Sequence, residues 1–275
     1  MNLFNDHFQN YKSYNIPKAQ LIIADIPYNI GKNAYGSNPS WYKDGDSKNG
    51  ESDKANSEFF DTDKDFRISE FLHFCSKMLR KEPKKKGNSP CMIVFCAFDQ
   101  QMEIIEKAKK YGLNNYINLV FRKNFSAQVL KANMRVVGNA EYALILYRDK
   151  LPKFNNNGKM VMNIMDWVRD NETEKIHPTQ KPIKVLERLI EIFTDEGEVV
   201  IDPTAGSATS LLAATKCNRK AYGFEIKKDF FKPASKILTE YETQKKEIAE
   251  FGFSKTEFQN QDQTFLFADV ENENK

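Results

Sequence analysis

The segment Leu21–Ile30, with the sequence LIIADIPYNI, constrains the fold of this chain more than any other stretch. Its first four residues are all apolar, which is typical of a strand buried on both faces, as in a parallel sheet. Functional groups in such sheets gather at the carboxyl ends of the strands. There Asp25 offers a carboxylate, Pro27 holds Ile26 in an extended conformation, and Tyr28 offers an aromatic face. The alternative is a plain strand-ending turn without a further role.

Apolar runs and amphipathic stretches alternate along the rest of the chain. We expect strands at residues 91–98, 116–121, 142–147, 199–201 and 221–224, and helices at 66–80, 100–111, 182–193 and beyond 241. Strands that alternate with helices predict a parallel sheet with helices on both faces. The sequence therefore predicts an α/β fold with a doubly wound, mostly parallel sheet and an antiparallel edge, in a single domain over residues 1–275.

The composition is that of a globular protein, with 40% hydrophobic and 29% charged residues. The longest apolar runs have the length of strands, so we expect no membrane span. The N-terminus lacks the basic start and apolar core of a secretion signal, which favours a cytoplasmic protein. The four cysteines form no CxxC pair and no metal-ligand spacing with the three histidines, so we expect reduced, buried thiols and no metal site.

Charge is spread unevenly along the chain. Residues 121–160 carry eight basic and two acidic residues, whereas residues 240–275 carry four basic and nine acidic ones. This pattern indicates one face for a polyanion and one that avoids it. The polar stretch 32–65 is predicted to be a mobile loop, in which Trp41 either contacts bases or holds the loop in place. Residues 150–175 show the least pattern and are predicted to be a small insert.

A second informative segment is Val199–Ser210, VVIDPTAGSATS. A buried strand delivers Asp202, a loop of small residues with Gly206 lets the backbone approach a ligand closely, and a helix begins near Thr209. A strand, a small-residue loop and a helix N-terminus together are typical of a nucleotide-cofactor site. Glu225 ends the following strand, where an acidic side chain is well placed for ribose hydroxyls. A helix cap and a surface glutamate are the alternative.

The third segment is HPTQKP, from His177 to Pro182, immediately before the helix at 182–193. It brings an imidazole, a hydroxyl, an amide and an ammonium group to a helix N-terminus, a setting that attracts a carboxylate. A helix entry with an ordinary cap would produce the same pattern.

Together these segments resemble the amino-methyltransferases of DNA, which transfer a methyl group from S-adenosylmethionine to adenine N6 or cytosine N4. The tetrapeptide at 25–28 resembles their catalytic D-P-P-Y motif, residues 202–209 resemble their cofactor loop D-P-F-x-G-S-G-T, and HPTQKP resembles the segment that precedes this loop. The order of the motifs is similar to the beta arrangement of the family, and NAEYALILYR, at Asn139–Arg148, resembles one of its late strands. The resemblance spans residues 21–226. The chain departs from the motifs at Ile26, Thr204 and Ala208.

The resemblance implies a Rossmann-like methyltransferase fold, with residues 150–175 as a small target-recognition insert. It also implies that the Asp25 carboxylate and the Ile26 carbonyl accept the two N–H bonds of a flipped base, on which Tyr28 stacks. Catalysis is thereby assigned to Asp25, Ile26, Pro27 and Tyr28. By the same resemblance, the residues that hold the cofactor are Asp202, Thr204, Gly206, Ser207 and Glu225. Residues near its ends are Asp6 at the adenine, and His177, Thr179 and Lys181 at the amino-acid end.

We therefore predict an S-adenosylmethionine-dependent DNA methyltransferase. Adenine N6 is favoured because the catalytic motif opens with Asp, where cytosine enzymes more often have Ser. Two alternatives stay open, N4-cytosine methylation and a regulator of the same fold that binds DNA or cofactor without catalysis. A nucleotide-dependent oxidoreductase is disfavoured because GxGxxG is missing. The predicted partner is DNA, and a homodimer and a cognate restriction endonuclease are left open. The predicted DNA contacts are Trp41, Arg122, Lys123, Lys131 and Arg135.

Overall fold

The structure is a computed structural model that describes residues 1–28, 66–124, 128–131, 136–167, 170, 173–177 and 180–251. The chain divides into two compact units, residues 1–234 and residues 235–275. Several predictions lie outside the described residues, namely the mobile loop at 32–65 and the site residues Trp41, Arg135 and Thr179. One domain over the whole chain stays a prediction.

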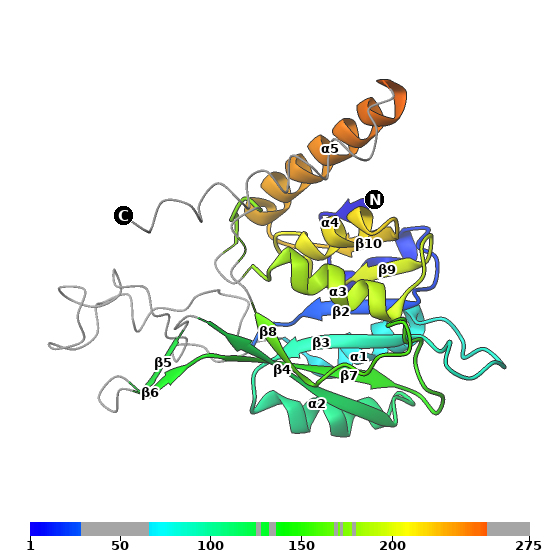
Figure 1. Cartoon of the computed structure of the whole chain (residues 1–275), viewed down its shortest axis with the longest axis vertical. Coiled ribbons are helices and arrows are strands. Elements are labelled where there is room, and N and C mark those ends of the chain that lie inside the picture. Colours follow the sequence, from blue (N-terminus) through cyan, green and yellow to red (C-terminus); the bar gives the residue numbers. More distant parts are fainter. Residues whose placement is uncertain are drawn as a thin grey trace, which may run out of the picture. The chain divides into compact units, whose positions relative to one another are not determined.

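The first unit is built on an eight-stranded sheet with the strand order β1-β10-β9-β2-β3-β7-β4-β8 (Figure 1). Neighbouring strands in it are parallel, except that β7 is antiparallel to both β3 and β4. The predicted, mostly parallel sheet is thus confirmed. The predicted antiparallel edge is wrong, because the reversed strand β7 lies inside the sheet between β3 and β4, and both edge strands, β1 and β8, pair in parallel. The strands are β1 (Asn2–Phe4), β2 (Leu21–Asp25), β3 (Cys91–Cys96), β4 (Asn115–Lys123), β7 (Ala140–Tyr147), β8 (Ile164–Trp167), β9 (Val199–Asp202) and β10 (Lys220–Phe224).

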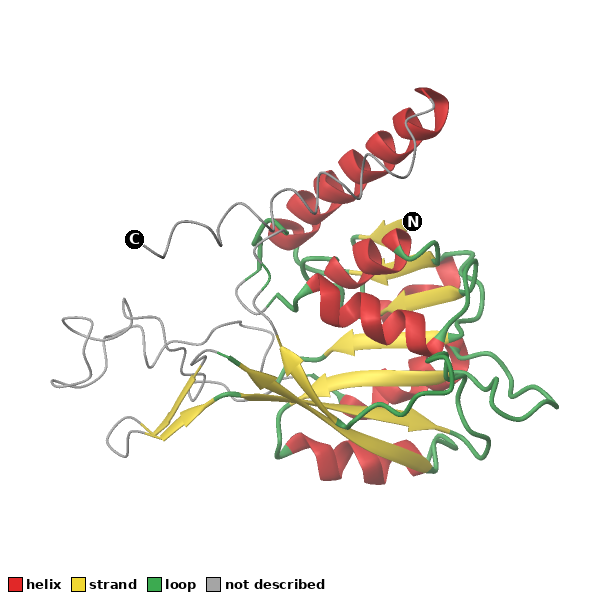
Figure 2. Ribbon diagram, in the orientation of Figure 1, coloured by secondary structure: helices red, strands yellow, loops and turns green. Residues whose placement is uncertain are grey.

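Helices cover both faces of this sheet (Figure 2). In Figure 1, α3 (Ile183–Phe193) and α4 (Thr209–Lys216) lie in front of the strands, and α1 (Ile68–Met78) lies behind them. The core on the far face joins α1 with α2 (Gln100–Lys109) and the short 3-10 helix η1 (Phe8–Ser13). α5 (Lys228–Phe251) spans the boundary between the two units. Among the described residues, no helix combines the length and apolarity needed to cross a membrane.

The alternation of side chains along β2 between the two faces of the sheet determines the direction of the Asp25 side chain. Ile22 and Ala24 belong to the core under α1 and α2. Successive side chains of a strand point to opposite faces, so Asp25 is directed to the face that α3 covers. Lys181, two residues before α3, forms an ion pair with Asp25 on that face. The strand and the helix entry therefore converge on one point.

Two pairings have no counterpart in the sequence prediction. The stretch 150–175 contains β8, which joins the main sheet by pairing in parallel with β4. β5 (Gln128–Lys131) and β6 (Val136–Gly138) form a separate antiparallel ribbon. Lys131 is therefore a strand residue, although its side chain lies outside the described part. Target recognition by residues 150–175 stays a prediction.

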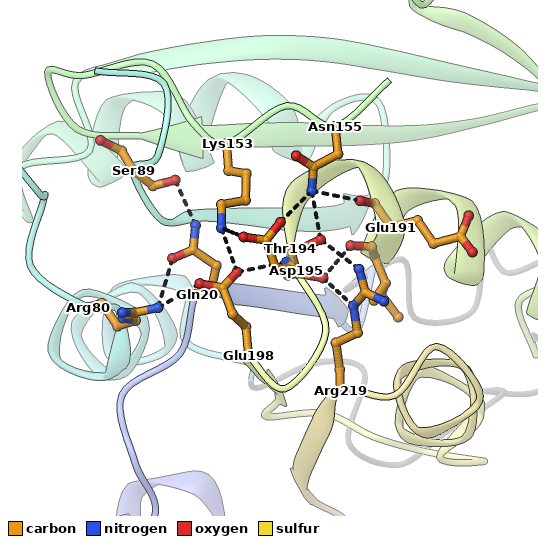
Figure 3. A network of polar contacts seen from close by, with 11 residues as sticks. Gln20, Arg80, Ser89, Lys153, Asn155, Glu191, Thr194, Asp195, Glu198 and Arg219 are labelled. Atoms are coloured by element: carbon orange, nitrogen blue, oxygen red, sulfur yellow. Dashed lines mark hydrogen bonds and ion pairs between the residues drawn. The ribbon is translucent and has the colours of Figure 1, made fainter. Parts of the chain in front are cut away.

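A network of ion pairs and hydrogen bonds lies at the amino ends of β9 and β10 (Figure 3). The Lys153 ammonium pairs with Asp195 and Glu198. The Arg219 guanidinium donates to the hydroxyl and to the carbonyl of Thr194, over 2.9 and 2.6 Å. These groups precede β9 and β10, at the opposite end of the sheet from the predicted site. The network therefore fixes the loops at one end and leaves the carboxyl ends of the parallel strands for chemistry.

Candidate active site

One face of the sheet gathers charged and aromatic side chains near the carboxyl end of β2. Paired residues on neighbouring strands share a face. The pairs that line this face are Asp25 with Phe95, Phe121 with Glu141, and Lys123 with Trp167. The three rings among them lie 5.3 to 6.5 Å apart, measured between centroids. They form an apolar floor beneath the charged groups.

The turn after β2 is held by hydrogen bonds to its backbone. The Ile26 N–H donates to the Phe95 carbonyl over 3.2 Å. The side-chain amide of Gln100 donates to the Pro27 carbonyl over 3.0 Å, and its oxygen accepts from the Ala97 N–H over 3.0 Å. Gln100 is buried. The predicted catalytic turn is therefore fixed before any ligand arrives, and Gln100 is a contributor that the sequence did not reveal.

The Asp25 carboxylate is paired with a lysine from a distant segment. The Lys181 Nζ lies 2.5 Å from the Asp25 Oδ2, and only 7% of the Lys181 side chain is exposed. Its ammonium also lies 5.5 to 5.8 Å from the ring centroids of Tyr28, Phe95 and Trp167. Sequence reasoning assigned Lys181 to the cofactor by resemblance, whereas its described contacts are on the catalytic side of the site.

Both pKa values of this pair depart from their ordinary positions. Burial raises the pKa of Asp25, and the Lys181 charge opposes that rise. Burial acts to lower the pKa of Lys181, but the carboxylates of Asp25 and Glu141 outweigh it and raise the pKa. Lys181 is therefore charged at neutral pH, and its charge favours the ionised form of Asp25.

One oxygen of Asp25 is left for another donor. Its Oδ1 is buried and has no hydrogen-bond partner among the described residues. A buried acceptor without a donor is costly, and such groups in native structures call for an explanation. A ligand N–H at this position would supply the missing bond. The Asp25 carboxylate is thus half occupied by Lys181 and half available.

Tyr28 is anchored at its hydroxyl end. The Tyr28 Oη donates to the Glu141 Oε2 over 2.8 Å, and the other Glu141 oxygen pairs with Lys123. The Lys123 ammonium lies 5.2 Å from the Trp167 ring centroid. Glu141 and Trp167 are absent from the sequence prediction. A signal existed for Glu141, because it is a carboxylate that directly precedes an apolar run, as Asp25 directly follows one.

The predicted cofactor loop connects β9 to α4 and contacts the end of β10. Asp202 is buried, accepts from the Thr204 N–H over 2.9 Å and from the Ser210 hydroxyl, and burial raises its pKa to about 7. The Glu225 Oε2 accepts from the Gly206 N–H over 2.8 Å, and burial raises the Glu225 pKa. Gly206 has a φ of +52°, which favours glycine.

A hydrogen bond joins the predicted cofactor loop to the strand that carries the predicted catalytic turn. The Thr204 hydroxyl donates to the Asp25 carbonyl over 3.1 Å. The strands that carry the two acidic residues, β2 and β9, are direct neighbours in the sheet. The structure therefore brings together Asp25 and Asp202, which are far apart in the sequence, at one end of the sheet.

Three further residues predicted to hold the cofactor are described, and these are His177, Ser207 and Asp6. The His177 ring centroid lies 4.4 Å from that of Phe230, with the ring planes tilted by 60°, and burial, with the Lys181 charge, lowers the His177 pKa to about 4. The Ser207 hydroxyl lies 2.8 Å from the Thr209 hydroxyl. Asp6 accepts hydrogen bonds from the three groups that hold the start of η1, which are the His7 N–H, the Asn10 amide and the Tyr14 hydroxyl.

The predicted DNA contacts that the structure describes differ in exposure. Arg122 is exposed and forms an ion pair of 2.7 Å with Asp166. Both residues line a cavity of about 340 Å³ together with Asn124 and Trp167. Only 10% of the Lys123 side chain is exposed, and it pairs with Glu141. Lys123 is therefore part of the largely buried site network, whereas Arg122 lies exposed in its ion pair with Asp166.

The chain is similar to known DNA methyltransferases. The sequence pattern of the DNA methylase family matches residues 19–236. The chain is 27% identical over 251 residues to the DNA adenine methyltransferase YhdJ of Escherichia coli K12, over 84% of this chain and 79% of that protein. It is 36% identical over 103 residues to the type II methyltransferase M2.DpnII of Streptococcus pneumoniae, over 36% of this chain and 38% of that protein.

Solved structures show the same fold. The crystal structure of the M1.HpyAVI–SAM complex superimposes with a TM-score of 0.60 at 20% identity, covering 86% of this chain and 98% of that one. The predicted Rossmann-like methyltransferase fold is thus confirmed.

Proposed function

The chain belongs to the DNA methylase family whose members act on N6 or N4 amines, and from this premise we propose that it methylates the N6 amine of adenine in DNA. The reaction class, transfer of a methyl group from S-adenosylmethionine to an exocyclic amine of DNA, is that of the family. The choice of adenine is supported by the acidic residue that opens the catalytic turn and by the name of the similar E. coli enzyme, a DNA adenine methyltransferase.

The observation that carries this proposal is the half-occupied carboxylate of Asp25. An exocyclic amine has two N–H donors, and its lone pair is delocalised into the base. The Asp25 Oδ1, which has no partner among the described residues, and the adjacent Ile26 carbonyl would accept these two N–H bonds. Accepting both bonds favours a tetrahedral nitrogen, whose lone pair can then attack. Aligning two bound reactants in this way lowers a barrier by roughly 7 to 11 kcal/mol.

Lys181 keeps the acceptor in its useful form. A protonated Asp25 would be a donor at one oxygen and would bind the amine poorly. Because the Lys181 ammonium contacts Oδ2, it opposes the effect of burial and leaves Oδ1 free. Once the methyl group is on the nitrogen, the amine proton becomes acidic, and Asp25 is placed to receive it. We therefore reassign Lys181 from the cofactor to the catalytic carboxylate.

The residues at the loop after β9 fit S-adenosylmethionine. Acidic side chains end the adjacent parallel strands β9 and β10, and a glycine at positive φ lies in the loop between them. When bound, S-adenosylmethionine supplies a methyl group on a sulfonium, which is electrophilic. The residues proposed to hold it are Asp202, Thr204, Gly206, Ser207 and Glu225, with His177 and Thr179 near its amino-acid end and Asp6 near its adenine. The Thr204 hydroxyl ties this set to Asp25.

A target base stacked inside a duplex cannot reach the partly buried Asp25 carboxylate, so the proposed reaction requires base flipping. We propose that Tyr28 stacks on the flipped base, and that Arg122 contacts the DNA backbone. Trp41, Lys131, Arg135 and residues 150–175 complete the proposed DNA surface. The name of the similar type II methyltransferase supports a cognate restriction endonuclease as a partner. A homodimer and a cytoplasmic location remain proposals.

The identity of the methylated base tests this function. The full chain is expressed in a host without DNA methyltransferases, and genomic DNA is digested to nucleosides for mass spectrometry. N6-methyladenine, absent from the empty-vector host, is the expected product. N4-methylcytosine would overturn the choice of adenine. A chain that binds S-adenosylmethionine in a titration, yet leaves every base unmodified in the host, would show a regulator in place of an enzyme.

A further inference from the structure

We infer that Glu141 is a positioning residue, which fixes the ring of Tyr28 as the platform on which the flipped base stacks. The inference rests on the proposed function, because it gives a role to the ring that faces the base. Glu141 need not contact DNA or the cofactor for this role. It acts through one hydrogen bond to Tyr28.

The ring of Tyr28 is held at both of its ends. At the backbone, the carbonyl of the preceding residue, Pro27, accepts from the buried Gln100 amide over 3.0 Å. At the far end, the Tyr28 hydroxyl donates to the Glu141 Oε2 over 2.8 Å. A tyrosine side chain turns about two torsions, and a fixed backbone together with a fixed hydroxyl oxygen sets the first torsion and the axis of the ring. The phenol O–H prefers to lie in the ring plane, so the direction of the Glu141 oxygen also favours one ring orientation. The ring is therefore placed in advance of binding.

Glu141 is itself held against rotation. Its second oxygen, Oε1, pairs with Lys123 of the neighbouring strand. The two side chains are 17% and 10% exposed, so the pair is largely shielded from water. The Lys123 ammonium lies 5.2 Å from the Trp167 ring centroid. Each carboxylate oxygen thus has one partner, and the Oε2 that faces Tyr28 cannot turn away without breaking the ion pair.

The charge state of Glu141 gives the bond its direction. Burial acts to raise the pKa of Glu141, but the charges of Lys181 and Lys123 outweigh it and lower the pKa. Burial and the Glu141 charge raise the pKa of Tyr28. At neutral pH the carboxylate therefore accepts and the phenol donates, and hydrogen bonds to an ionised acceptor are stronger than those between neutral groups.

If the Glu141–Lys123 ion pair were purely structural, it would contribute to folding stability alone. A double-mutant cycle distinguishes this role from the positioning of Tyr28. The variants are Tyr28→Phe, Glu141→Ala and their combination, with Glu141→Gln as the conservative change whose amide oxygen still accepts from Tyr28. The readouts are kcat/KM on a DNA duplex and the fluorescence of 2-aminopurine at the target position, which falls when the base stacks on a ring.

We expect Tyr28→Phe and Glu141→Ala each to lower kcat/KM about tenfold, as the loss of one charge-assisted hydrogen bond would. The combination is expected to lower it little further, because both changes remove the same bond. Glu141→Gln should recover part of the Glu141→Ala loss. Both single variants should raise 2-aminopurine fluorescence, since the ring no longer holds the base in one plane.

The chain offers a matched control at the opposite end of the sheet. Glu198 is 18% exposed and pairs with Lys153, which is 9% exposed, so Glu198→Ala breaks a comparable ion pair away from the site. It is expected to lower the melting temperature and to leave kcat/KM unchanged. If the wild-type protein transfers no methyl group, the proposed function fails. The positioning role is wrong, while the function stands, if the wild type is active and the losses in kcat/KM of the two single variants multiply in the combination. The same holds if the wild type is active and the single variants leave the 2-aminopurine fluorescence unchanged.

Discussion

The Thr204 hydroxyl donates a hydrogen bond of 3.1 Å to the main-chain carbonyl of Asp25. These residues are 179 positions apart in the sequence, and they belong to the two halves of the proposed site, the cofactor loop and the catalytic turn. The bond sets the distance between the groups that would hold the methyl donor and the carboxylate that would hold the amine. Two reactants must meet in line for the transfer, so this link is expected to matter for rate more than for folding.

Replacing Thr204 with valine tests the link. The change keeps the side-chain volume and removes the donor to the Asp25 carbonyl. We expect kcat to fall about fivefold to tenfold, while the free energy of unfolding falls by only about 1 kcal/mol. Thr204→Ser keeps the hydroxyl and should stay close to the wild type. Steady-state kinetics and urea unfolding measure the two quantities, and a Thr204→Val enzyme with wild-type kcat would contradict the proposed coupling.

Lys181 is predicted to set the acidic limb of the pH–rate profile. Burial raises the pKa of Asp25, and Lys181 is the main group that opposes this. In Lys181→Met the Asp25 pKa rises further, and the nearby Glu141 charge pushes it in the same direction. Activity requires the ionised carboxylate, so the acidic limb should move to higher pH and activity should recover as pH increases. Lys181→Arg keeps the charge and serves as the control. Profiles of kcat against pH that coincide for all three proteins would exclude this role.

Asp202 is predicted to make the protein less stable as pH rises. Its folded-state pKa of about 7 lies above its ordinary value of 3.8. A group of this kind contributes stability that is fully present below the unfolded-state pKa and is lost as pH rises through the folded-state value. Relative to Asp202→Asn, the wild type should therefore lose stability between pH 4 and pH 7, by up to about 4 kcal/mol. Urea unfolding of both proteins across this range measures the difference, and a constant difference would refute the prediction.

The parts of the fold and site that the sequence predicted share a local signal. Asp25, Asp202 and Glu225 each end a buried apolar strand, and in a parallel sheet such ends must meet at one edge. β8 gave no such signal, because it is a short edge strand in which only Trp167 is buried. Edge strands can alternate polar and apolar residues without forming an apolar run.

The polar contacts of the site could not be predicted because their partners are distant in sequence. The Lys181–Asp25 pair joins residues 156 positions apart, and the Tyr28–Glu141 bond joins residues 113 apart. Glu141 also lies just before the strand expected at 142–147, so it was not counted in it. For α5, the prediction began beyond residue 241, whereas the helix begins at Lys228 and contains Pro233. Proline inside a helix is unfavourable, which hid the earlier turns.

The rate of the methyl-transfer step in Asp25→Ala tests the central claim most directly. Enzyme saturated with labelled S-adenosylmethionine is mixed with a DNA duplex, with the enzyme in molar excess over the target sites. The label transferred to the DNA is then followed over a single turnover. The account predicts a rate at least about a thousandfold below the wild type, with the dissociation constant for S-adenosylmethionine unchanged within about twofold, because the lost group orients the amine and leaves the cofactor loop intact. An Asp25→Ala enzyme that transfers methyl groups within about tenfold of the wild-type rate would contradict it.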